Sequence, residues 1–117
     1  MKTLKFEIPE YHSGLNTTIR RGVKKSKEFK AGDQFVMVSP DGTLYDTPAF
    51  KVVFVRTGRF VSPYVGKSIT NRDLSLHHLE SVRSSLEPYI DALAELKKHY
   101  PGFDPSECVT VIGFSEI

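Results

Sequence analysis

The sequence predicts an α+β domain in which helices pack against one end of a small curled sheet or barrel. In the first half, apolar residues alternate with polar ones or form short runs bounded by Gly and Pro, which is typical of strands. From Asp73 the apolar spacing becomes helical, and one more β-branched run follows near the end. With 117 residues, 39% of them hydrophobic, the chain fits a single domain over residues 1–117.

The strands of the first half are predicted from their alternation and their flanking turns. Residues 4–8 alternate apolar and charged side chains, and the run 34–39 precedes a Pro-Asp-Gly-Thr turn at 40–43. Residues 49–61 are apolar on both faces and contain Gly58 near their end. We therefore expect a central strand there, with a bend or bulge at Gly58.

Two helices are predicted next. Residues 79–86 place apolar side chains on one helical face. The pattern Ser84-x-x-Glu87, followed by a proline, indicates a capping box that starts a second helix, and the basic residues 97–99 suit its last turn. The run 109–114 is the closing strand.

Charge is distributed unevenly along the chain. Residues 1–72 hold 13 of the 16 Lys and Arg against 6 of the 14 Asp and Glu, whereas residues 73–117 hold 3 against 8, so the net charge of +2 hides a basic half. The basic residues concentrate in a segment at 20–30, which we call the basic segment and expect to be a surface loop; the alternative is a solvated loop that serves only solubility. Its cations are Arg20, Arg21, Lys24, Lys25, Lys27 and Lys30.

Several classes of protein and site are disfavoured. The single cysteine, Cys108, excludes an internal disulfide and is expected to be a buried strand thiol. No run approaches the ~20 apolar residues of a membrane span, and the charged start excludes a signal peptide, so a cytoplasmic protein is predicted. Phosphate-binding Gly-rich loops are absent and no cofactor is expected. His77 and His78 are adjacent, which on a helix favours structural histidines over a metal site.

Several short motifs occur in a familiar order. They are Thr-Ile-Arg at 18–20, a short basic loop, Gly-Asp at 32–33 leading into a strand, Leu-Lys-Lys-x-Tyr-Pro-Gly at 96–102, and a final strand of the type Val-x-Val-Ile-x-Phe. In this order they resemble the ASCH domain of the PUA-like superfamily over nearly the whole chain. The resemblance implies a small PUA-like β-barrel with helices packed at one side. It also implies a cleft, bordered by Thr-Ile-Arg, that receives RNA or a nucleobase.

Some members of that family resemble amidohydrolases that act on N4-acetylcytidine. They use a lysine three residues before the threonine of Thr-Ile-Arg, that threonine, and a glutamate of the helical region. Carried over to this chain, the threonine is Thr18, the glutamate is Glu87, and the lysine position is occupied by Leu15. Since leucine cannot transfer a proton, this departure puts the hydrolysis in doubt, although Lys51 is a candidate for the missing amine.

These observations lead to three hypotheses. The first is a module that binds RNA or single-stranded nucleic acid, with the cations of the basic segment on phosphates and Tyr64 as a stacking aromatic. The alternative for Arg20 and Arg21 is an ion pair with an acid such as Asp33 or Glu87. The second hypothesis is a hydrolase of modified nucleosides or a ribonuclease, and the third is a protein-interaction adaptor that uses the acidic half.

Overall fold

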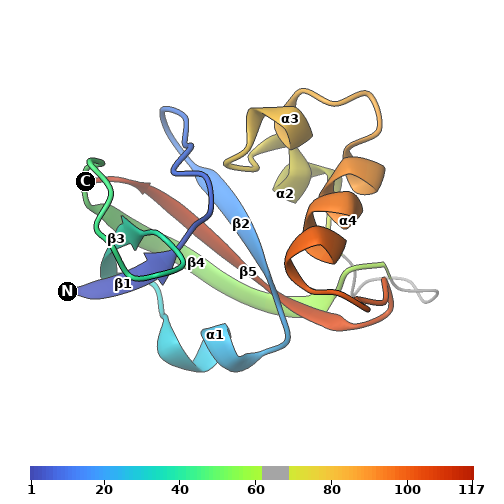
Figure 1. Cartoon of the computed structure of the whole chain (residues 1–117), viewed down its shortest axis with the longest axis horizontal. Helices are drawn as coiled ribbons and strands as arrows, with labels where there is room; N and C mark the ends of the chain where they lie inside the picture. Colours follow the sequence, from blue (N-terminus) through green and yellow to red (C-terminus); the bar gives the residue numbers. More distant parts are fainter. Residues whose placement is uncertain (62–68) are drawn as a thin grey trace.

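The computed structural model describes residues 1–61 and 69–117 and consists of a five-stranded sheet with three of its helices gathered at one end (Figure 1). This architecture confirms the predicted α+β class. No helix in the described part of the chain has the length and apolar character needed to cross a membrane. The elements in chain order are β1 (Lys2–Lys5), β2 (Asn16–Arg21), α1 (Lys24–Glu28), β3 (Gln34–Val38), β4 (Phe50–Arg59), α2 (Asn71–Ser75), α3 (Glu80–Arg83), α4 (Pro88–His99) and β5 (Cys108–Glu116).

The sheet has the strand order β1-β3-β4-β5-β2. β1 and β3 are parallel and the other neighbours are antiparallel. β4 lies between β3 and β5, which confirms its predicted central position. Among the described residues no pairing joins β1 to β2, so closure of the sheet into a barrel is not confirmed.

Two hydrophobic clusters hold the fold together. One is aromatic and is centred on Phe35, whose ring lies 5.5 Å from that of Phe50 and 5.3 Å from that of Phe114. The other lies beneath the helices and includes Val82 and Leu96. β5 contributes to both clusters, and each large side chain buried there is worth roughly 1.5–3 kcal/mol. The helices are therefore anchored to the sheet through β5.

The helical region differs from the prediction. Residues 79–86 do not form one helix, because α3 ends at Arg83 and Leu86 lies beyond it, 100% exposed. α4 begins at Pro88 without a side-chain cap, so the capping box predicted from Ser84 is wrong. A capping box does form at the start of α2, where Thr70 and Asp73 exchange hydrogen bonds. The proline at the first turn of α4 is as predicted.

Two details of the strands also differ. The bulge predicted at Gly58 occurs instead between Val52 and Phe54, where the pairing of β4 with β5 shifts register and Val53 becomes 47% exposed. Cys108 was expected to be buried but is exposed, because it is the first residue of β5 and burial begins at the following valine.

The basic segment is partly helical. Residues 24–28 form α1, whereas the sequence predicted a loop, and the helix buries none of its own residues. The predicted turn at Gly32 is confirmed, since this glycine has a φ of +95°, a conformation that costs glycine little. Phe29, between the helix and the turn, is 3% exposed and anchors the segment to the aromatic cluster.

Candidate nucleobase cavity beside β2

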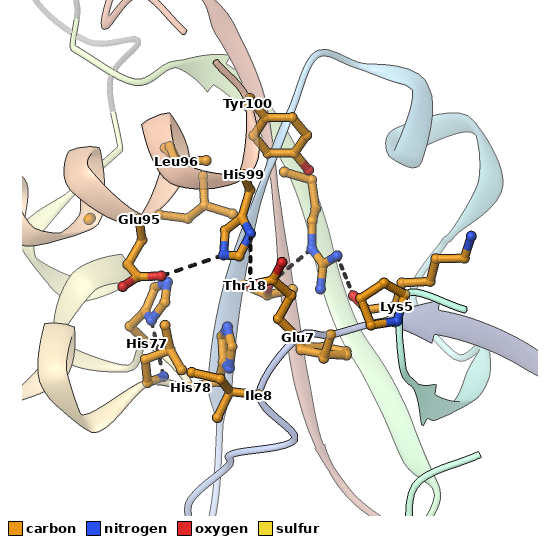
Figure 2. Close-up of a pocket in the computed structure, with 16 residues that line it drawn as sticks. Lys5, Glu7, Ile8, Thr18, His77, His78, Glu95, Leu96, His99 and Tyr100 are labelled. Atoms are coloured by element: carbon orange, nitrogen blue, oxygen red, sulfur yellow. Dashed lines mark hydrogen bonds and ion pairs between the residues drawn. The ribbon is translucent and has the colours of Figure 1, made fainter. Parts of the chain in front are cut away.

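A cavity of about 370 Å³ lies between β2, the residues that follow β1, the segment between α2 and α3, and the C-terminal half of α4 (Figure 2). Its volume is within the range of small-molecule sites. The lining combines apolar side chains with polar groups from four separate elements. The lining residues that matter for its chemistry are Thr18, Arg20, His77, His78, Glu95 and His99.

Arg20 is held firmly at this cavity. Its Nε donates to the Thr18 hydroxyl oxygen at 3.1 Å, and its Nη1 donates to the Lys5 carbonyl at 2.6 Å. The guanidinium carbon lies 4.5 Å from the centre of the Phe6 ring, a cation–π contact. Burial lowers the pKa of Arg20 to about 10, against an opposing interaction with Tyr100, so the group stays protonated at neutral pH.

The guanidinium of Arg20 keeps free donor capacity. It has five N–H groups, and among residues 1–61 and 69–117 two of its nitrogens have protein acceptors. No carboxylate among residues 1–61 and 69–117 forms an ion pair with it. The predicted alternative partners are engaged elsewhere or distant: Asp33 pairs with Lys2 at 2.8 Å, and Glu87 does not line the cavity.

β2 positions Thr18 and aligns the two histidines with it. The β-branched residues of β2 suit a strand, and one of its edges pairs with β5. Along the other edge, Thr17 N–H donates to the Leu76 carbonyl at 2.8 Å and His78 N–H donates to the Thr17 carbonyl at 2.9 Å. These two bonds place His77 and His78 directly beside the strand that carries Thr18.

His77 and His78 are both buried, with 5% and 7% of their surfaces exposed, and their rings stack with centroids 4.7 Å apart. Leu79 N–H donates to His77 Nδ1 at 3.1 Å, and His78 Nδ1 contacts the Glu10 carbonyl at 3.2 Å. Burial, reinforced by Arg20 and Arg83, lowers the pKa of His77 to about 4. Burial and the neighbouring His77 lower the pKa of His78 well below its usual range. Both rings are therefore neutral at pH 7.

Two carboxylates and a third histidine border the same cavity. His99, in the last turn of α4, lies 3.4 Å from a Glu7 oxygen through Nδ1 and 3.5 Å from a Glu95 oxygen through Nε2. Figure 2 shows His99 between these two acids. The contact with Glu7 joins α4 to the segment after β1, whereas the contact with Glu95 lies within α4 itself. Sequence reasoning missed all three residues.

The structure brings together only part of the predicted catalytic set. Thr18 lines the cavity, whereas Glu87 and Lys51 are exposed and do not. Glu87 precedes the first turn of α4, whereas the cavity is lined by residues from Ala92 onward, the first of which lies roughly 7.5 Å further along the helix at 1.5 Å per residue. The carboxylates that do reach the cavity are Glu7 and Glu95.

The lysines of the basic segment lie outside the cavity lining. Lys24, Lys27 and Lys30 are exposed, and Lys25 is half-buried with its amine 2.9 Å from a Glu28 oxygen. Arg21 forms an ion pair with Glu107 at 2.8 Å. Tyr64 lies outside the described residues. No cluster of three or more potential metal ligands is found in the part of the chain that the structure describes.

The fold defines the class: an α+β domain with the architecture of ASCH-domain structures. The sequence matches no protein-family model and no curated relative. Among solved structures it is similar to the ASCH domain from Lactobacillus crispatus JV V101, with a TM-score of 0.55 and 15% identity, covering 92% of this chain and 65% of that one. It is also similar to protein EF3133 from Enterococcus faecalis V583, described by the family model DUF984, with a TM-score of 0.56 and 12% identity.

These similarities establish the fold. They confirm, at that level, the resemblance to the ASCH domain predicted from the motifs. The match to protein EF3133 covers 87% of this chain and 60% of that one, so this chain spans less than two thirds of either structure.

Proposed function

We propose that the chain is an ASCH-type module that binds RNA or single-stranded nucleic acid by holding one unpaired base in the cavity beside β2. The observation that carries this proposal is the convergence of Thr18 and Arg20 on a cavity of about 370 Å³. A protonated guanidinium already fixed by two protein acceptors offers its remaining donors without losing further side-chain freedom on binding.

The exposed cations of the basic segment would act outside the cavity. Lys24, Lys27 and Lys30 have no buried role, and exposed lysines are well suited to contact phosphates along a flexible strand. Arg21 and Lys25 would also contribute, although each already forms an ion pair with an acidic neighbour that partly neutralises its charge. An unpaired strand suits this arrangement because its bases can turn out of the stack and enter a cavity, as the bases of a duplex cannot.

Catalysis has less support than binding. A threonine nucleophile requires a base within hydrogen-bond reach, and neither Glu87 nor Lys51 lines the cavity that contains Thr18. The adaptor hypothesis and the cytoplasmic location remain predictions from the sequence.

The test is a titration of the protein against a short fluorescently labelled single-stranded RNA, followed by anisotropy at several salt concentrations. We expect log Kd to change linearly with log salt, with a slope of roughly 0.7 for each phosphate neutralised, and a duplex of the same sequence to compete poorly. A flat salt profile, or a duplex that binds as well as the single strand, would contradict the proposal.

A further inference from the structure

The hydrogen bonds of His77 and His78 require opposite tautomers. Nδ1 of His77 accepts a bond from the Leu79 N–H, so the proton of this neutral ring is on Nε2. Nδ1 of His78 faces the Glu10 carbonyl, which can only accept, so here the proton is on Nδ1 and Nε2 carries a lone pair. One ring therefore has a free donor and the other a free acceptor.

Both free nitrogens have access to the cavity. Within residues 1–61 and 69–117, no protein atom bonds to Nε2 of either ring. In the same residues the only side-chain polar atom that is both fully covered and without a partner is the Thr47 hydroxyl oxygen, so the two Nε2 atoms are not fully covered. Both residues line the cavity, so their side chains border the space in which a ligand would lie. Figure 2 shows both rings pointing toward the space bordered by Thr18, Glu95 and His99.

The positions of the two rings are fixed through the backbone. Arg83 Nη1 donates to the His77 carbonyl at 2.9 Å and to the His78 carbonyl at 3.3 Å. The bonds along β2 hold the same segment from the other side. A donor and an acceptor held in this way present a fixed pattern to a ligand rather than an adaptable one.

We infer that His77 and His78 form a neutral donor–acceptor pair that recognises the hydrogen-bonding edge of an uncharged heterocyclic base, one with an acceptor adjacent to a donor. The Nε2–H of His77 donates to a ring nitrogen or carbonyl of the base, and Nε2 of His78 accepts from its ring N–H or amino group. This inference deepens the proposed function and rests on it, because it concerns the same cavity. It adds the hydrogen-bonding pattern of the base that enters and two specificity-determining residues.

The charges around the pair favour a neutral ligand over an anion or a metal ion. The carboxylates of Glu7 and Glu95 border the same space and would repel a phosphate. A metal ion would meet the Nε2–H of His77 instead of a lone pair, and Arg20 would repel it. The lowered pKa values of both histidines agree with this, because they keep the rings uncharged over the physiological range.

Two experiments on the complete chain test the inference. Long-range ¹H–¹⁵N spectra of labelled protein at neutral pH identify the protonated nitrogen of each histidine, and we expect Nε2 for His77 and Nδ1 for His78. Calorimetric titrations then compare uridine with 3-methyluridine and cytidine with N4,N4-dimethylcytidine. In each pair methylation removes the donor that would meet His78, and we expect the nucleosides that bind to lose about tenfold or more in affinity.

Variants assign the effect to the pair. His77→Phe and His78→Phe should each weaken binding of the preferred nucleoside by about tenfold or more, whereas the matched control His12→Phe should leave it within about twofold. His12 also bonds to the neighbouring segment, at the Leu76 carbonyl, but does not line the cavity. If a Phe variant does not fold, the tautomer spectra and the methylated nucleosides still decide.

The outcomes separate this inference from the proposed function. The inference would be overturned if the two rings had identical tautomers or were protonated, if none of these nucleosides bound, or if binding were insensitive to methylation. Salt-dependent RNA binding could still stand in each of these cases. Loss of RNA binding with nucleoside discrimination intact would instead contradict the proposed function and leave the base-recognising pair in place.

Discussion

The cavity beside β2 and the basic segment carry polar side chains in opposite ways. At the cavity, Arg20 and the two histidines are each held by hydrogen bonds to named backbone or side-chain atoms, and both histidines are buried. In the basic segment, Lys24 is 88% exposed and its nearest acidic oxygen is 4.0 Å away. Fixed geometry thus belongs to one region and exposed charge to the other.

This difference indicates how the two regions would divide the work of binding. Exposed lysines in high dielectric attract any polyanion and are screened by salt. A fixed donor, a fixed acceptor and a guanidinium in a recess can distinguish one ring edge from another.

Acid should destabilise the cavity wall. The pKa of His77 is lowered to about 4 in the folded state, so as the pH falls the unfolded chain binds a proton at this histidine before the folded chain does. The contribution of His77 to the free energy of unfolding is therefore fully present above about pH 6.5 and is lost as the pH drops below that value. We expect a loss of about 1.4 kcal/mol per pH unit from this histidine, approaching about 3 kcal/mol near pH 4. His78, shifted in the same direction, adds to the loss.

Urea unfolding at a series of pH values measures this effect. His77→Phe should flatten the profile, while His12→Phe, which changes a histidine outside the cavity, should not. A free energy of unfolding that stays constant between neutral pH and pH 5 would show that these rings are not held neutral, and the contrast between the two regions would fail.

Removing the guanidinium at the cavity should weaken RNA binding without changing its salt dependence. Arg20→Met keeps an apolar side chain at this position but loses the charged donors and the guanidinium that lies over the Phe6 ring, so we expect a loss in affinity of roughly tenfold to a hundredfold. Anisotropy titrations measure it, with Arg59→Met, an exposed arginine of β4, as the matched control. If both variants lose affinity equally, Arg20 acts only through its charge.

Removing charge from the basic segment should change the salt dependence of RNA binding and leave recognition at the cavity intact. In the triple variant Lys24→Ala, Lys27→Ala and Lys30→Ala, we expect the salt slope of RNA binding to fall by about 2, or roughly 0.7 per lysine, with nucleoside affinity unchanged. The control removes the same number of exposed lysines elsewhere, at Lys51, Lys97 and Lys98. Equal slopes in the two triple variants would mean that the basic segment has no special part in binding.

The smallest effect concerns the ion pair between Arg21 and Glu107. Both side chains are partly exposed, at 38% and 31%, so solvent screens the pair despite its 2.8 Å separation. Arg21→Gln should therefore leave the midpoints of thermal and urea unfolding nearly unchanged. A large drop in either midpoint would indicate that this surface is more ordered than its exposure suggests.

Local signals in the sequence predicted much of the fold and part of the site. The apolar run of β4 depends on residues close in sequence, and this strand is where it was expected. The site required more distant information. Glu95 was missed in favour of Glu87 because the position of α4 against the sheet, which its spacing does not reveal, decides which end reaches the cavity.

The histidine pair shows the same limit more sharply. Adjacent histidines are visible in the sequence, but their tautomers depend on the Leu79 N–H and on the carbonyl of Glu10, which is 68 residues away. Burial follows similar long-range rules, since Cys108 and Val109 are neighbours in the same strand and only the valine is covered. Pattern therefore predicts which element forms, while packing decides which side chain is presented to a ligand.

The most direct test of the account is to map the amide and histidine ring signals of ¹⁵N-labelled protein during titration with a short single-stranded RNA. We expect the largest shifts at Thr18, Arg20, His77 and His78, and we expect them to persist as salt is raised while shifts at α1 fade. Shifts confined to α1, or spread over the surface with the cavity unaffected, would contradict it.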